Sequence, residues 1–152
     1  MISNWNYRGK DILCINDMKV HEPKVWGFVY LLSLYDKSGE LIHKYIGKKN
    51  IYSKRKRNFG KKELENLKDK RKKTYEYIIK ESDWQKYLSS NLFIKKNSSN
   101  FAIQREIICF STNDSDLTYK EAKEIICQGA LESPFFLNDG VSIRRFKGKL
   151  IE

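Results

Sequence analysis

The chain has 152 residues, and its 30 Lys and Arg outnumber 19 Asp and Glu, so the formal net charge is +11. A chain of this length forms one domain with a modest core, and it holds no apolar run long enough to cross a bilayer. The charge favours nucleic acid as the partner over a membrane surface, because the basic residues do not border a clean apolar face. A solvated lysine-rich surface is the alternative interpretation of the same charge.

The first 25 residues are expected to be an extended lead-in that packs on the main domain, residues 26–152. The start, Met1-Ile2-Ser3-Asn4-Trp5, has no basic segment followed by an apolar one, so we expect no secretory signal and a cytoplasmic location. A short strand is predicted from Ile12 to Ile15. The three cysteines are widely spaced and form no C-x-x-C pair, which argues for free thiols and against a zinc site.

A β-hairpin is predicted over residues 26–47. Residues 26–35 are apolar at nearly every position, as in a strand buried on both faces, and residues 41–47 form the returning strand. The turn lies at Asp36 to Gly39. A four-residue loop places Tyr30 opposite Tyr45, whereas a three-residue loop places Tyr30 opposite Ile46.

Basic residues dominate the segment from Lys48 to Lys73, which holds thirteen Lys or Arg and only three acids. We predict a helix over residues 63–73, a second helix over 83–88, a strand over 100–111 and a third helix over 118–131. A turn over residues 135–140 precedes the segment 141–146. The predicted fold is a small α+β domain with a central antiparallel sheet of about three strands flanked by helices. The buried stripe of the third helix comprises Ala122, Ile125, Ile126, Gly129 and Ala130.

Two tyrosines at strand ends, one arginine and one glutamate suggest phosphate chemistry. Phosphodiester hydrolysis needs a nucleophilic water, stabilisation of charge at phosphorus and help for the leaving oxygen. Near a divalent cation and lysines the pKa of a tyrosine should fall, so Tyr30 is the candidate that activates water, and Tyr45 shares or supports that task. Arg55 offers a planar fork for two phosphate oxygens.

Glu121 is the candidate metal ligand. A single carboxylate can anchor one hard cation when water and phosphate fill the remaining positions. On the predicted helix Glu121 borders the apolar stripe, whereas Glu124 points nearly opposite it. Thr118 and Glu121 also fit a capping box, which is the structural alternative for this glutamate.

The other candidates have structural alternatives too. Tyr30 and Tyr45 can be ordinary core aromatics. Arg55 has basic residues on both sides, so composition does not single it out. Lys44 alternates with Tyr45 along the strand and reaches the same face only if the strand bends or bulges near Gly47.

Five segments follow one another in an informative order. They are Asn4-Trp5-Asn6-Tyr7-Arg8-Gly9-Lys10, Gly27-Phe28-Val29-Tyr30, Lys44-Tyr45-Ile46-Gly47-Lys48-Lys49, Glu81 to Tyr87 with Ser89-Ser90, and Glu121-Ala122-Lys123-Glu124. No single tripeptide among them is specific, but their order and spacing resemble the GIY-YIG nuclease superfamily over almost the whole chain. The resemblance is greatest to small phage proteins related to Seg-type homing endonucleases.

The resemblance implies roles for individual residues. The tyrosines of the two core motifs fall on Tyr30 and Tyr45, and the glycine of the second motif falls on Gly47. The family's arginine stands eight positions after that glycine, at Arg55. Three further matches are Lys44 for a lysine that precedes the second motif in some members, Glu121 for the metal-binding glutamate and Asn138 for a late asparagine. Phe28 departs from the first motif at its glycine position, and the two motifs are farther apart than in many members.

The resemblance also implies a function, that of a phage-encoded, homing-endonuclease-like DNA endonuclease. Such an enzyme uses one divalent cation, Mg²⁺ or Mn²⁺, and leaves 5′-phosphate and 3′-hydroxyl ends on DNA, here expected to be double-stranded. No separate DNA-reading module is visible, so we expect weak specificity that comes from the basic residues, from a homodimer or from an accessory partner. The basic residues expected to bind DNA are Lys48, Lys49, Lys54, Lys56, Arg57, Lys61 and Lys62.

Two other functions fit the same composition. One is a non-catalytic nucleic-acid-binding module that keeps the GIY-YIG fold. The other is a basic factor that binds an acidic protein partner.

Overall fold

The computed structural model describes residues 1–67 and 72–142 of the chain. Its strands are β1 (Ile2–Tyr7), β2 (Lys10–Ile12), β3 (Gly27–Tyr35), β4 (Leu41–Asn50), β5 (Tyr52–Asn58), β6 (Tyr75–Glu81) and β7 (Ala102–Ser111). Its helices are α1 (Ile15–Lys19), α2 (Lys61–Glu65), α3 (Leu92–Asn97) and α4 (Asp114–Cys127), with a 3₁₀ turn, η1 (Ser98–Asn100). Over the described ranges no helix combines the length and the apolar character that a membrane span requires.

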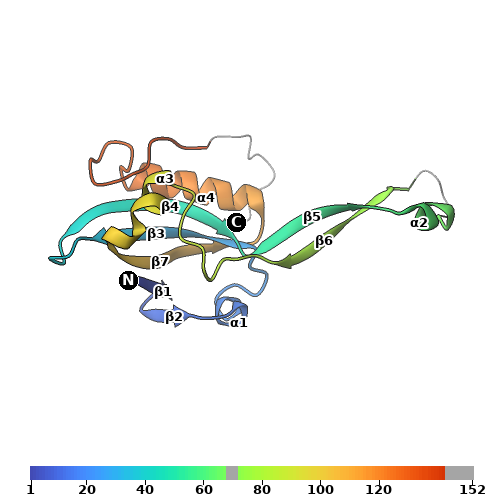
Figure 1. Ribbon diagram of the computed structural model, residues 1–152, viewed down its shortest axis with the longest axis horizontal. Coiled ribbons are helices and arrows are strands. Elements are labelled where there is room, and N and C mark those ends of the chain that lie inside the picture. Colours follow the sequence, from blue (N-terminus) through green and yellow to red (C-terminus); the bar gives the residue numbers. More distant parts are fainter. Residues whose placement is uncertain (68–71, 143–152) are drawn as a thin grey trace.

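The described strands form two sheets. A five-stranded sheet has the order β2-β1-β7-β3-β4, and β5 and β6 form a separate two-stranded sheet that projects far from it (Figure 1). The larger sheet is mixed, because β1 runs parallel to β7, whereas the pairs β1–β2, β3–β4 and β3–β7 are antiparallel. The α+β class agrees with the prediction. The three strands β7, β3 and β4 are antiparallel as predicted, but the sheet is larger than about three strands, because residues 1–25 add β1 and β2 to it.

The lead-in is therefore folded rather than extended. The strand predicted from Ile12 to Ile15 ends at Ile12, and α1 follows. The Asp17 carboxylate accepts hydrogen bonds from the backbone N–H groups of Leu13 (2.9 Å) and Cys14 (3.2 Å). These bonds satisfy donors that a helix start leaves free, and they stop the strand from continuing.

The β3–β4 hairpin was predicted correctly, and it separates two cores. On one face of β3, Phe28, Tyr30, Leu32 and Leu34 pack with Trp5 and Trp84. On the other face Val29 packs with Ile46 of β4 and with Leu117 and Ile125 of α4, which lies across this side of the sheet (Figure 1). The nearly continuous apolar sequence of β3 thus reflects a strand covered on both faces.

The register of the hairpin matches neither predicted alternative. Tyr30 lies opposite Gly47, and Tyr45 lies opposite Leu32. The pairing passes from Leu34↔His43 to Tyr35↔Leu41, so β4 carries one extra residue at Ile42 beside a five-residue loop. Gly39 has φ +85° in this loop, a conformation that glycine adopts without strain.

The predicted helix over residues 83–88 is wrong. Residues 84–86 form a single turn, in which the Tyr87 N–H donates to the Asp83 carbonyl at 3.0 Å, and distant side chains bond to the carbonyl groups that follow. The Trp5 indole donates to the Trp84 carbonyl at 2.8 Å, and Arg105 donates to the carbonyls of Gln85 and Tyr87 at 3.0 and 2.9 Å. The helix over 63–73 appears only as α2, and residues 68–71 of that prediction lie outside the described part. Helix α3 was not predicted.

The strand predicted over 100–111 is β7, apart from its first two residues, while the helix predicted over 118–131 begins and ends earlier. The Asn113 side chain caps α4 by accepting a hydrogen bond from the Asp116 N–H at 2.8 Å. Thr118 is thus inside the helix, and the capping-box alternative for Glu121 is wrong. Ile126, expected in the buried stripe, is 62% exposed. Of the predicted segment 141–146, residues 143–146 lie outside the described part.

Candidate active site

No strand of the described residues pairs with the outer edge of β4, so its outward backbone groups need other partners. At Lys44 the backbone pairs with the carbonyl of Phe135 and the N–H of Leu137, both at 2.8 Å. At Ile46 the Asn138 side chain bonds to both backbone groups: it accepts a hydrogen bond from the N–H at 2.9 Å and donates one to the carbonyl at 2.8 Å. Asn138 therefore substitutes for a strand at the middle of this edge.

Two residues farther along the edge stands Lys48, whose charge and backbone N–H both lower the pKa of the Glu121 carboxyl on α4. The Lys48 ammonium donates to Thr118 Oγ1 at 2.6 Å, which ties the same residue to the helix at a second point. Glu121 thus lies at the open edge of the sheet, beside a lysine that bonds to the same helix.

A cleft of about 920 Å³ opens over this edge, between α3 and α4. It has the size of a small-ligand or active-site cavity. The polar groups that line it include an amide, a carboxylate, an ammonium and several hydroxyls, and they belong to Asn138, Glu121, Lys48, Tyr45, Tyr87 and Ser90.

Tyr45 and Glu121 interact across the cleft. Burial raises the pKa of the Glu121 carboxyl, and the charge and backbone N–H of Lys48 offset part of that rise. Burial also raises the pKa of the Tyr45 hydroxyl; the Ser90 hydroxyl opposes this rise by hydrogen bonding, and the Glu121 charge adds to it. A cation placed between the two groups would favour both charged forms.

Tyr30 lies beneath the cleft and does not line it. Its side chain is fully buried, and its ring centroid lies 5.2 Å from Trp5 and 6.4 Å from Tyr45. Its hydroxyl has no well-formed hydrogen bond to a described residue, and its polar neighbours are the side chains of Tyr87 and Ser89. Burial, and then Tyr87 and Tyr45, raise the pKa of Tyr30 well above its usual value. A metal-assisted fall in that pKa therefore works against this environment.

Gly47 makes room for the Tyr30 side chain. A Cβ at Gly47 would collide with the Oη and Cζ atoms of Tyr30, which lies opposite it in the sheet. The second motif thus provides Gly47, which leaves space for the Tyr30 ring, and Tyr45, which lines the cleft.

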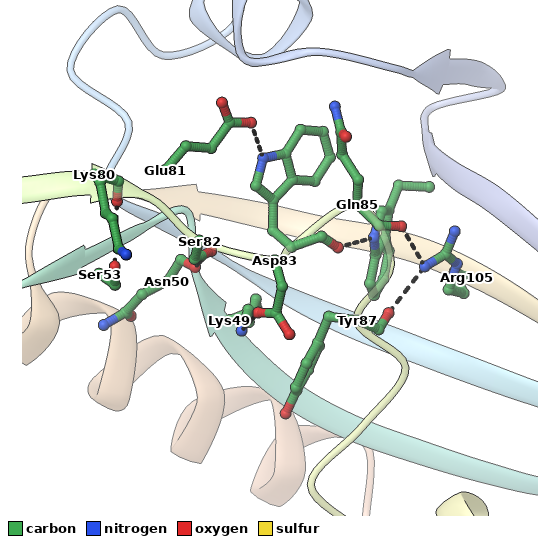
Figure 2. A network of polar contacts seen from close by, with 12 residues as sticks. Lys49, Asn50, Ser53, Lys80, Glu81, Ser82, Asp83, Gln85, Tyr87 and Arg105 are labelled. Atoms are coloured by element: carbon green, nitrogen blue, oxygen red, sulfur yellow. Dashed lines mark hydrogen bonds and ion pairs between the residues drawn. The ribbon is translucent and has the colours of Figure 1, made fainter.

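The sequence motifs did not assign roles to Tyr87, Ser90 and Asn91, which form one wall of the cleft. Figure 2 shows how the Arg105 guanidinium reaches the carbonyls of Gln85 and Tyr87 and holds this wall. The Lys49 ammonium lies 4.1 Å from the Tyr87 ring centroid and 2.6 Å from the Asp83 carboxylate. In the sequence, this wall corresponds to the segment from Glu81 to Ser90, which is part of the resemblance to the family.

Lys44 and Arg55 are not among the residues that line the cleft. Lys44 keeps the regular alternation of β4 and lies on the face opposite Tyr45, with its ammonium 5.9 Å from the Phe136 ring centroid. Arg55 stands in β5, opposite Ile78, and its side chain is exposed. The structure thus brings together Tyr45, Glu121 and Asn138 but leaves these two basic residues apart from them.

Residues 5–141 match the family described as "Putative endonuclease segE, GIY-YIG domain". The chain belongs to this GIY-YIG endonuclease family. Neither the curated proteins nor the solved structures give a significant match to it. The match covers the tyrosine hairpin, the β5–β6 projection and α4, so the cleft is built from elements that this GIY-YIG domain family shares.

The donor atoms at the cleft of this GIY-YIG domain suit a hard cation. They are oxygens, from the half-buried carboxylate of Glu121 and neighbouring hydroxyls, and Mg²⁺ and Mn²⁺ prefer oxygen ligands, whereas zinc prefers nitrogen and sulfur. The described residues contain no group of three or more His, Cys, Asp or Glu side chains able to hold a metal. A cation held by Glu121 would therefore need water and substrate phosphate to complete its coordination.

Proposed function

We propose that this protein is a DNA endonuclease that requires one divalent cation, Mg²⁺ or Mn²⁺, and hydrolyses phosphodiester bonds to 5′-phosphate and 3′-hydroxyl ends. The observation that carries the proposal is the meeting of Tyr45 and Glu121 in one cleft, at the edge of β4, in a member of the GIY-YIG endonuclease family. The net charge of +11 supports DNA as the substrate.

Glu121 is the proposed cation ligand. Its raised pKa reflects a carboxylate that burial has stripped of water, and such a group gains most when a cation binds. When bound, the cation would lower the pKa of a water molecule and neutralise charge on the phosphate. Lys48, whose ammonium is near the same carboxylate, would contact the phosphate from the floor of the cleft.

The geometry changes the division of labour between the tyrosines. Tyr45 borders the cleft and is proposed to orient the attacking water through its hydroxyl, together with Ser90. Tyr30 is enclosed, so we propose that it supports Tyr45 and Gly47 from behind and stays protonated. Hydrolysis then forms a new oxygen–phosphorus bond and breaks the bond to the 3′-oxygen, which leaves as the 3′-hydroxyl.

Arg55 remains the proposed group that stabilises phosphate charge, but it would do so from β5 rather than from the cleft wall. Its guanidinium makes no hydrogen bond or ion pair with another described residue, so it is available to DNA. We give Lys44 no chemical role, because it does not line the cleft and its ammonium lies over the Phe136 ring.

Cleavage of supercoiled plasmid tests the proposal. Wild-type protein should cut with Mg²⁺ and not with EDTA, and Glu121→Ala should abolish cutting while duplex binding persists. Glu124→Ala is the matched control, because Glu124 stands on the same helix and bonds to Gln128 at 2.9 Å. End-labelling identifies the termini. Full-rate cutting by Glu121→Ala would contradict the cation site, and tight binding with no cutting by wild type on several plasmids would favour a non-catalytic binding module.

A further inference from the structure

The projection formed by β5, α2 and β6 is here called the arm and comprises residues 52–67 and 72–81. It extends away from the larger sheet as a two-stranded ribbon with α2 near its far end (Figure 1). Its described residues hold nine Lys or Arg and four Glu. Six of the seven residues of β6 are exposed. A role in the core therefore does not explain which residue types stand at these positions.

The pairing of β5 with β6 sorts the side chains of the arm onto two faces. Lys56 lies opposite Tyr77, and Lys54 lies opposite Ile79, so these residues share one face. On it the ammonium of Lys54 lies 4.7 Å from the Tyr77 ring centroid, and that of Lys56 lies 4.1 Å from the Tyr75 ring centroid. The two tyrosine rings are themselves 5.6 Å apart. We call Lys54, Lys56, Tyr75 and Tyr77 the Lys–Tyr face.

On the opposite face the strands carry Arg55, Arg57 and Lys80, and among these three Arg57 is paired. Arg57 forms ion pairs with Glu63 at 2.9 Å and Glu76 at 2.6 Å. On the Lys–Tyr face the β-strand carboxylate is Glu81, at the base of the arm, where it accepts a hydrogen bond from the Trp84 indole at 2.8 Å. The lysines of this face therefore keep their charge for a partner.

The arrangement of lysine over tyrosine favours phosphate over nucleobase as the group that is bound. A ring face already covered by an ammonium is closed to base stacking, which is how single strands are usually held. The same contact orders a long flexible side chain before binding, so less entropy is lost when a phosphate arrives. β5 has seven residues and spans about 20 Å, roughly the rise of six base pairs.

We propose that the Lys–Tyr face lies along the sugar–phosphate backbone of duplex DNA and holds it irrespective of sequence. This inference rests on the proposed nuclease function and adds to it a holding surface outside the cleft. It also divides the basic residues. Lys54 and Lys56 bind DNA through this face, whereas Arg57 is engaged inside the arm, and Lys49 is engaged at its base with Asp83.

The test is equilibrium binding of fluorescent duplexes of two unrelated sequences, in EDTA, at several salt concentrations. The double variant Lys54→Gln/Lys56→Gln should lower the slope of log K against log salt by about 2, close to 0.9 per lost phosphate contact, and equally for both sequences. Lys54→Arg/Lys56→Arg keeps the charge and should retain the wild-type slope. The matched control is Lys19→Gln/Lys24→Gln, which removes two exposed lysines far from the arm in the sequence and should leave the slope unchanged.

Three outcomes would overturn the inference. The first is an unchanged salt slope in Lys54→Gln/Lys56→Gln. The second is an equal loss of salt slope in Lys80→Gln, on the opposite face. The third is a lower sedimentation coefficient for Lys54→Gln/Lys56→Gln than for the wild type without DNA, which would show that the face is a contact between copies of the protein. Because the readout is binding without metal, absence of cleavage by the wild type would leave this test intact. The two proposals can therefore fail separately.

Discussion

The larger sheet and the arm are both built from strands, yet different forces place their side chains. In the larger sheet Tyr30 and Ile46 are fully buried, on opposite faces, and packing fixes each of them. In the arm, strand pairing alone sets which side chains share a face, and the apolar side chains of Ile78 and Ile79 remain 43% and 55% exposed. Positions in the sheet are therefore intolerant of volume changes, and those in the arm are tolerant of them.

This difference suggests a division of tasks. A cation ligand and a water-orienting hydroxyl need fixed positions, and the rigid sheet edge provides them. Contacts to a phosphate backbone need charge and reach more than fixed geometry, and a ribbon in solvent provides those.

The largest expected effect is that of Arg55→Ala on the rate of cleavage, and it would show that the arm takes part in the chemical step. If Arg55 stabilises charge at the scissile phosphate, the rate of cleavage at saturating DNA should fall by about 100-fold, although the residue stands in the arm. Single-turnover cleavage measures this rate separately from binding. Lys80→Ala, in β6 on the same face of the arm as Arg55, is the control. A loss confined to KM would place Arg55 with the DNA-holding residues instead.

Gly47→Ala and Gly60→Ala compare the two regions directly. A Cβ at Gly47 meets the buried Tyr30 ring, so the free energy of unfolding should fall by about 1–3 kcal/mol. At Gly60, in the arm, the nearest atom is Glu63 Oε2 at 3.9 Å, and the change should stay within about 0.5 kcal/mol. Urea unfolding of both variants provides the measurement, and equal losses would contradict the proposed difference in packing.

Glu121→Gln sharpens the comparison through pH. Because the pKa of Glu121 is raised in the folded state, the folded protein binds a proton more tightly than the unfolded chain, and ionisation of Glu121 destabilises it above that pKa. In EDTA at pH 8 the variant should therefore be more stable than the wild type. The difference should vanish in acid, below the ordinary glutamate pKa. A less stable variant at pH 8 would mean that Lys48 more than offsets the burial.

Asp83→Asn tests the joint between the two regions and should have the smallest effect. The hydrogen bond and charge of Lys49 lower the pKa of Asp83, so this pair stabilises the fold at neutral pH and ceases to do so as Asp83 is protonated. Since the Asp83 side chain is 72% exposed, the loss at pH 7 should be about 0.5 kcal/mol or less. Thermal unfolding at pH 7 checks it, with Asp11→Asn as an exposed control.

The sequence predicted the elements that have strong local patterns. The apolar run of β3 and the periodic residues of α4 were visible without tertiary information. The register was not, because it depends on one extra residue at Ile42 in a bulge. The single turn over residues 84–86 could not be predicted either, since Arg105, on a strand that follows later in the chain, bonds to carbonyl groups that a longer helix would use.

The candidate site was predictable to a similar extent. Motif spacing selected Tyr45, Glu121 and Asn138, which the fold gathers at one sheet edge. It also selected Tyr30, and nothing in the sequence shows that this tyrosine would be enclosed while its neighbour is open. Tyr87 and Ser90 reach the cleft from a segment without regular structure, so no periodicity could have pointed to them. The alternating lysines and tyrosines of the arm were present in the sequence, but pairing was needed to show that they share a face.

The parallel pairing of β1 with β7 has a consequence for how the protein is made. Trp5 pairs with Arg105, so about a hundred further residues must be synthesised after Trp5 before this neighbour exists. Until then the hairpin of β3 and β4 lacks its other flanking strand, and Glu121 has not yet been synthesised. A nascent chain stalled before β7 is expected to be protease-sensitive and harmless to DNA, so the strand order itself delays the proposed nuclease activity until β7 and α4 have been made.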